Sequence, residues 1–250
     1  MKKILTLCVA LSFQIQAQVQ SKETQPSSNI KERQYTGFRL IMDCSLRAPV
    51  LFEQVISRDN SKLHHRSSYF LDPGFDADCQ QRSVGQYKES FKRIAYTRGQ
   101  LVAPESIDIT KNVAMEAFNI TNVIPMSTTL KDGGWKFTNE FQECERDISD
   151  ILVVGGAIYN NKQNDIFRLS HGVATPDYLW KVVFFSDKHA AWLFPNNNYP
   201  TYKNANNYLV PLSKIEKMTG YRVFGKQVDK DYVPSERFVT VKRKPRCNLT

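Results

Sequence analysis

The sequence has no Cys-x-x-Cys spacing, and only 4 of its 250 residues are histidines. The missing cysteine pairs argue against a zinc ribbon or a thiol-redox site. No apolar run approaches the roughly 20 residues that a membrane-spanning helix needs, so we expect no membrane span. No internal repeat and no second linker divides the chain. These absences favour a single domain that is neither a zinc module nor an integral membrane protein.

The first 17 residues have the pattern of a secretory signal peptide. Lys2 and Lys3 are followed by an apolar run over residues 4–13 and by the small residue Ala17. This pattern predicts export to the periplasm or the medium. The rest of the chain contains four cysteines: Cys44, Cys79, Cys144 and Cys247. An even number of cysteines in an exported chain predicts two disulfides, and three pairings are open.

Composition divides the rest of the chain into a lead-in and a domain. Residues 18–34 are rich in Gln, Ser, Lys and Thr, so we expect them to be disordered. Residues 35–250 are long and apolar enough to form one domain with a sizeable core. The formal net charge of +9 falls to +7 when Lys2 and Lys3 are removed with the signal peptide. A basic exported domain favours a polyanionic partner, either nucleic acid or another phosphate-rich polymer.

Clusters of β-branched and aromatic residues predict strands at residues 93–96, 151–154, 181–185, 191–194 and 238–241. A helix is expected over residues 135–147. Its apolar face is formed by Phe137, Phe141 and Cys144. The mixture of strands and helices predicts an α+β fold.

A second helix has recognisable signals at both ends. Ser213 and Glu216 have the spacing of a capping box, in which two side chains satisfy free backbone N–H groups at a helix start. Gly220 can adopt the left-handed conformation that commonly ends a helix. We therefore expect a helix between residues 213 and 220.

Residues 96–104 read Tyr-Thr-Arg-Gly-Gln-Leu-Val-Ala-Pro. They resemble the Asp-Arg-Gly-His motif of the DNA/RNA non-specific endonucleases, with glutamine in place of histidine. Other segments resemble the same family in the same order: residues 69–73, 118–126, 130–135, 151–159, 176–183 and 208–224. The resemblance covers roughly residues 35–224. It implies a ββα-metal nuclease-like fold, which is an α+β fold with a central antiparallel sheet flanked by helices, and a metal-dependent phosphodiester hydrolase as the family's activity.

Phosphodiester hydrolysis needs a base that activates water and a divalent cation that neutralises the leaving oxygen. In the family, the motif histidine is the base, an asparagine holds magnesium and a glutamate orients the waters of the metal. These positions fall here on Gln100, Lys131 and Asn139. A carboxamide is not a base near neutral pH, and an ammonium has no lone pair for a metal. The resemblance therefore implies a degenerate site without a bound metal.

Part of the family pattern is retained. Arg98 matches the motif arginine, whose planar guanidinium suits bidentate binding of phosphate; a structural ion pair is its alternative role. Asn122 matches a polar residue beside the family's site, and Arg66 lies near the upstream phosphate-binding arginine. Together with Lys131, these residues form the candidate nucleic-acid-binding set. Trp135 is expected to be a core residue that anchors the helix.

Three functions are compatible with these residues. The first is an exported, catalytically degenerate protein that binds nucleic acid or another polyanion without a cofactor. The second is an active nuclease in which Gln100 orients water and Glu143 or Asp132 recruits magnesium. The third is a protein-interaction or effector domain without a nucleic-acid role, because a fold does not imply a function. The oligomeric state and the protein partner, if there is one, stay open.

Overall fold

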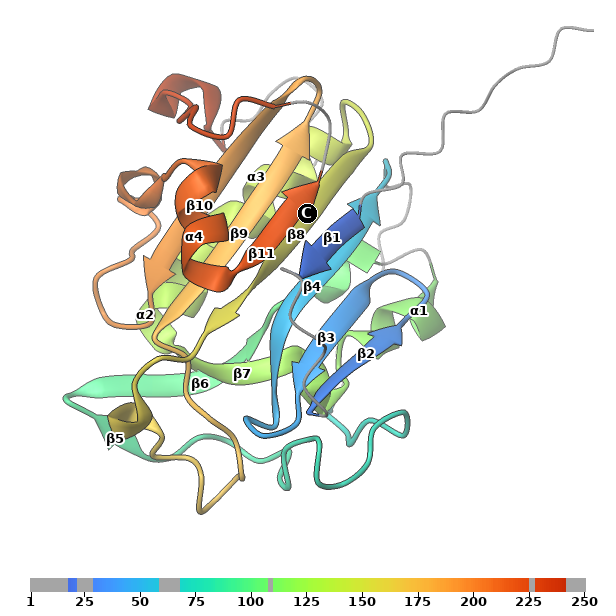
Figure 1. Cartoon of the computed structure of the whole chain (residues 1–250), viewed down its shortest axis with the longest axis vertical. Coiled ribbons are helices and arrows are strands. Elements are labelled where there is room, and N and C mark those ends of the chain that lie inside the picture. Colours follow the sequence, from blue (N-terminus) through green and yellow to red (C-terminus); the bar gives the residue numbers. More distant parts are fainter. Residues whose placement is uncertain (1–17, 22–28, 59–67, 108–109, 225–227, 242–250) are drawn as a thin grey trace, which may run out of the picture.

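The computed structural model describes residues 18–21, 29–58, 68–107, 110–224 and 228–241 (Figure 1). The predicted signal peptide and Arg66 lie outside these residues. The main element is a six-stranded antiparallel sheet in the order β10-β9-β8-β4-β3-β2. Its strands are β2 (Ile30–Gln34), β3 (Arg39–Asp43), β4 (Ala48–Ile56), β8 (Ile151–Ile158), β9 (Tyr178–Phe185) and β10 (Lys188–Pro195). The α+β prediction is confirmed.

Both faces of the large sheet are covered, so its central strands are apolar along their whole length. Every residue of β8 is buried. Val153 packs in a cluster with Trp135 and Phe141, whereas its neighbour Val154 packs on the opposite face with Ile215 of α4 (Leu212–Thr219). A two-stranded pair, β1 (Gln18–Ser21) and β11 (Tyr221–Phe224), lies near α4 in Figure 1. The continuous apolar runs in the sequence are the result of this double coverage.

A smaller sheet carries the Arg-Gly-Gln motif. Its order is β5 (Ser90–Phe91), β6 (Ile94–Gln100) and β7 (Val123–Ser127), and α1 (Lys111–Glu116) lies between β6 and β7 in the sequence. After β7 the chain continues through α2 (Thr128–Leu130) and a π-helical turn (Lys131–Trp135) into α3 (Lys136–Arg146). In Figure 1, β6 and β7 lie across one end of the large sheet. Two antiparallel strands and a helix thus form the ββα unit that the resemblance implies.

The helix predicted over residues 135–147 is confirmed as α3. Phe137, Phe141 and Cys144 are buried, as the apolar face predicts. The ring of Phe141 packs edge-on against Phe185 and Trp192, with centroid distances of 5.3 Å and 5.5 Å. No helix in the described part of the chain is long and apolar enough to cross a membrane.

The prediction of a capping box at Ser213 and Glu216 is wrong, although the predicted helix is present as α4. Pro211 is the N-cap of α4. The hydroxyl of Ser213 donates to Asp231, and the carboxylate of Glu216 accepts from a backbone N–H of β11. Both side chains are therefore used in tertiary contacts, which sequence spacing does not show. Gly220 ends α4 with a φ of 74°, as expected.

Two further expectations are wrong. Residues 238–241 do not form a strand; the chain forms a short 3-10 helix at Glu236–Phe238, and Val239 is buried in the core without strand pairing. The segment over residues 18–34, expected to be disordered, contains β1 and β2. β2 pairs with β3, and Arg33 of β2 donates to the buried carboxylate of Asp72. The polar composition of β2 hid this strand, although its pairing partner β3 is the next strand in the chain.

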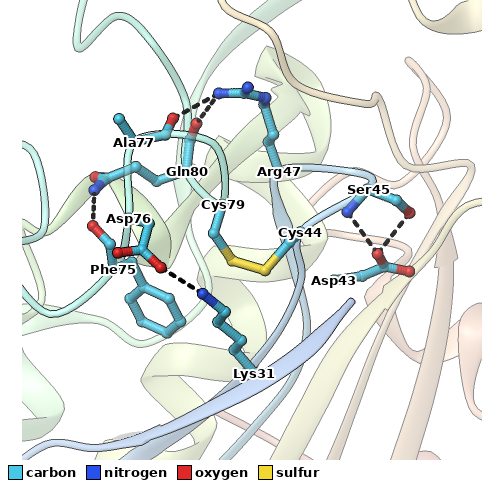
Figure 2. Close-up of a disulfide and its surroundings, with 10 residues drawn as sticks. All are labelled: Lys31, Asp43, Cys44, Ser45, Arg47, Phe75, Asp76, Ala77, Cys79 and Gln80. Carbon is cyan, nitrogen blue, oxygen red and sulfur yellow. Dashed lines mark hydrogen bonds and ion pairs between the residues drawn. A yellow bond between two sulfur atoms is a disulfide. The ribbon is translucent and has the colours of Figure 1, made fainter. Parts of the chain in front are cut away.

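A disulfide between Cys44 and Cys79 joins the end of β3 to the long loop that precedes β5 (Figure 2). The guanidinium of Arg47 donates to two carbonyl oxygens of the same loop. Cys144 is disulfide-bonded as well, and Cys247 lies outside the described residues. The prediction that cysteines are paired in disulfides is confirmed, and both partners are shown for the bond between Cys44 and Cys79. The disulfide holds a segment of the chain that has little regular structure of its own.

Candidate functional site

Arg98 and Gln100 lie two positions apart on β6 and therefore on the same face of the strand. Nη1 of Arg98 donates to the carbonyl oxygen of Val84 at 2.8 Å. The guanidinium lies over the ring of Tyr69, with Cζ 4.3 Å from the ring centroid. The described residues supply no carboxylate to pair with Arg98, so a carbonyl and an aromatic ring orient it instead of an ion pair. Arginine has five N–H donors, and the exposed part of this side chain is available to a ligand.

Gln100 is held through both ends of its amide. The hydroxyl of Tyr69 donates to Oε1 at 3.3 Å, and Nε2 donates to the carbonyl oxygen of Ala117 at 2.9 Å. Burial raises the pKa of Tyr69 above its usual value, so the phenol keeps its proton near neutral pH. Gln100 is thus a neutral, hydrogen-bonded group, and a carboxamide does not accept a proton near neutral pH.

Tyr69 is a site residue that the sequence did not single out. Its ring lies under Arg98, its hydroxyl reaches Gln100, and its ring also packs against Phe118 with 5.7 Å between centroids. The resemblance of residues 69–73 to the family was a signal for this segment, but it did not show the contact. Tyr69 orients the two motif side chains at the same time.

Asn122 is used inside the protein. It is fully buried, its Nδ2 donates to the carbonyl oxygens of Val102 and Ala117, and its Oδ1 accepts from the N–H of Val102. The carbonyl of Ala117 therefore accepts from both Asn122 and Gln100. Asn122 therefore lies beside the site and fixes the backbone carbonyl of Ala117, to which Gln100 also donates.

Trp135 and Asn139 are four residues apart and lie on one face of the helical segment, whereas Gly133, whose backbone angles are not helical, interrupts the regular spacing between Lys131 and Trp135. Nε1 of Trp135 donates to the carbonyl oxygen of Gln100 at 3.0 Å, which joins this face to β6. Trp135 is buried, as predicted. Lys131 is partly exposed, and its ammonium has no partner in the described structure. The helical segment that contains Lys131 and Asn139 is therefore joined to the strand that contains Gln100.

A buried lysine that the sequence did not single out lies behind this face. Nζ of Lys181 donates to Oδ1 of Asn139 at 2.5 Å and lies 4.1 Å from the ring centroid of Trp135. Burial holds the pKa of Lys181 well below its usual range, while the charge of Glu143 acts in the opposite direction. The nearest acceptors of Lys181 are neutral amides, at Asn139 and Gln142. A glutamate at position 139 would give this ammonium a counter-charge.

The side chains present do not fit magnesium held in the family's way. Lys131 offers an ammonium, and Asn139 uses its oxygen for a buried amine. Glu143 pairs with Arg146 at 3.1 Å, and Asp132 is exposed. Across the residues that the structure describes, no group of three or more His, Cys, Asp or Glu is placed to hold a metal ion.

The two described histidines are buried. His171 packs against Tyr87 and His189 against Tyr232, and burial lowers the pKa of both imidazoles. Neither hydrogen-bonds to Gln100 in the described structure. A general base in place of Gln100 would therefore have to be a residue other than His171 and His189.

Comparison with known proteins agrees with the arrangement of strands and helix. The family model for DNA/RNA non-specific endonucleases matches residues 15–230. A protein from Xenopus laevis named "Nuclease EXOG, mitochondrial" is 22% identical over 225 residues, which cover 82% of this chain and 61% of that protein. The chain thus spans less than two thirds of the length of this relative.

Proposed function

Because the chain belongs to the DNA/RNA non-specific endonuclease family, we propose that it binds nucleic acid, or another phosphate-rich polyanion, without hydrolysing it. The observation that carries this proposal is the state of Gln100, a neutral amide fixed by Tyr69 and Ala117 at the position of the family's base. Arg98, beside it, keeps the group that recognises phosphate. In this proposal the site has kept its binding chemistry and lost its proton acceptor.

The contacts of Arg98 support binding of phosphate. Its guanidinium stacks on Tyr69 and is anchored at Val84, which lowers the entropy it would lose on binding a ligand. A planar guanidinium can donate two parallel hydrogen bonds to one phosphate. The formal net charge of +7 that remains without Lys2 and Lys3 adds long-range attraction for a polyanion. Since the sequence predicts a signal peptide, we propose that the protein acts in the periplasm or the medium.

The loss of hydrolysis follows from two substitutions acting together. A positioned general base contributes about 10²–10⁴-fold to the rate of a reaction, and Gln100 cannot act as one. The divalent cation of the family neutralises charge on the reacting phosphate, and Lys131 and Asn139 do not provide its ligands. The charge of Lys131 would act in place of the metal, as a fixed cation that contacts phosphate. Binding should therefore weaken with salt but not require magnesium.

A plasmid-degradation assay on the purified mature protein tests the loss of hydrolysis. We expect intact plasmid in magnesium, in manganese and in EDTA. EDTA-sensitive cleavage that Gln100→Ala abolishes would overturn the proposal in favour of an active nuclease with a rearranged site. Cleavage that persists unchanged in both Gln100→Ala and Arg98→Ala would identify a contaminating nuclease.

A measurement of oligonucleotide binding distinguishes the proposed function from that of a protein-interaction domain. Labelled oligonucleotides are titrated with the wild-type protein and with Arg98→Ala, which removes the phosphate-binding group. We expect the variant to bind more weakly. If the wild-type protein binds no nucleic acid at low salt, the interaction-domain alternative replaces the proposal.

A further inference from the structure

The hairpin between β5 and β6 has an unusual turn. Phe91 pairs with Ile94, so Lys92 and Arg93 form a two-residue loop, and their φ angles are 50° and 65°. A two-residue hairpin with two positive φ angles is a type I′ turn, in which Asn-Gly is strongly favoured because large side chains are disfavoured there. Both residues are exposed. The turn therefore places two cations in solvent at a cost in backbone strain, and such strain often marks a functional position.

A second exposed feature lies against this turn. Tyr199 is 72% exposed, although hydrogen bonds fix the backbone around it. The N–H of Tyr199 donates to Asn197 at 3.0 Å, and its carbonyl oxygen accepts from Asn204 at 3.0 Å. The amide of Asn198 donates to the carbonyl oxygen of Arg93 at 3.1 Å. A rigid backbone thus presents an aromatic ring to solvent next to the basic turn.

The turn and the ring are connected to the candidate site. The same loop contacts the start of the helical segment, where the N–H of Gly134 donates to the carbonyl oxygen of Pro200. Arg93 and Arg98 flank the first part of β6, five residues apart in sequence, which corresponds to about 16 Å along a strand. In Figure 1 the β5–β6 hairpin extends beyond the large sheet. A ligand bound at Arg98 would have to span this distance to reach the turn.

We propose that the turn Lys92-Arg93 and the ring of Tyr199 form a docking surface for single-stranded nucleic acid, next to the site at Arg98. This inference depends on the proposed function and adds the kind of nucleic acid that is bound. The two cations would contact phosphates, and the exposed ring would stack on an unpaired base. A base in a duplex cannot offer its face to Tyr199, because it is already stacked. The surface should therefore favour single strands over duplexes.

The test compares a labelled oligothymidine with a duplex of the same length, in EDTA, at about 50 mM and about 200 mM salt. Tyr199→Ala should weaken binding of the single strand by about 5- to 150-fold and leave the duplex nearly unaffected. Tyr199→Phe keeps the ring and should retain binding. Phe238→Ala is the matched control, because Phe238 is also an exposed aromatic, 46% exposed, but lies over Lys188 at the other end of β10.

A substitution in the turn separates binding from folding. Lys92→Asn with Arg93→Gly installs the favoured residues of a type I′ turn, so the melting temperature should rise or stay unchanged. Binding of the single strand should nevertheless weaken, and its dependence on log salt should become shallower by about 1.4 for two lost phosphate contacts. A purely structural role for these residues predicts no loss of binding in a variant that is more stable.

A fluorescence measurement reports on Tyr199 directly. Trp135, Trp180 and Trp192 are buried, so Tyr199→Trp introduces an exposed indole. Oligothymidine should protect this indole from quenching by acrylamide. If Tyr199→Ala and the turn variant bind like the wild type while Arg98→Ala binds weakly, the docking surface is wrong and the proposed function stands. If the wild type binds neither oligonucleotide, the proposed function fails, and this inference fails with it.

Discussion

Removal of the Cys44–Cys79 disulfide should destabilise the fold by a predictable amount. The two cysteines are 35 residues apart in the sequence. For a closed loop of that length, the loss of chain entropy in the unfolded state corresponds to about 3–4 kcal/mol. In a domain of this size, each kcal/mol changes the melting temperature by about 2–4 °C, so Cys44→Ser with Cys79→Ser should lower it by about 6–16 °C.

The same variant should weaken the site. Cys79 lies between Tyr69 and Val84 in the sequence, and these two residues orient Arg98. A looser loop would let the guanidinium sample other conformations, so we expect weaker binding of oligonucleotides even at temperatures where the variant is folded.

Urea unfolding at neutral pH, without reductant, measures the free-energy difference between the wild type and the double variant. Asp76→Ala is a control from the same loop: it removes the exposed ion pair with Lys31 next to the disulfide (Figure 2), and exposed pairs contribute little. A loss of less than about 1 kcal/mol in the double variant would refute the chain-entropy argument and show that non-covalent contacts hold the loop.

Two further predictions concern the region of Gln100, Lys131 and Asn139. Restoring the family residues with Gln100→His, Lys131→Asn and Asn139→Glu together should produce magnesium-dependent plasmid cleavage at least about 100-fold above wild type; an inactive triple variant that folds normally would show that other parts of the mechanism are also missing. The second prediction concerns pH. Burial lowers the pKa of Lys181 in the folded state from the ordinary value of 10.5. Between the lowered pKa and 10.5 the unfolded state binds more protons than the folded state, so the free energy of unfolding should rise with pH over that window. Asn139→Glu alone should raise the pKa of Lys181 and flatten this rise in urea unfolding at pH 7 to 10, and an unchanged slope would contradict the assignment.

The sequence predicted the features that depend on local pattern. The apolar face of α3, with Phe137 and Phe141 buried, follows from helical periodicity. The end of α4 at Gly220 follows from the left-handed conformation that glycine adopts easily. The motif at Arg98 and Gln100 gave the family, and the comparison with the family model agrees.

The features that the sequence missed depend on contacts between distant segments. Tyr69 reaches Gln100 from 31 residues away, and Lys181 reaches Asn139 from 42 residues away. Arg33 of the polar strand β2 reaches Asp72 from 39 residues away. Periodicity and composition carry no information about such pairs, so candidate site residues could be proposed from the motif, whereas their contacts could not.

The most direct test of the central claim is a titration of labelled oligonucleotides with the mature protein, in EDTA and in magnesium, followed by denaturing electrophoresis of the same samples. We predict binding in EDTA that falls with salt, weaker binding by Arg98→Ala and by Lys131→Ala, and intact oligonucleotides in every lane. Binding that requires magnesium, or oligonucleotides that are cleaved only when magnesium is present, would contradict the account of a nuclease fold that binds nucleic acid without hydrolysing it.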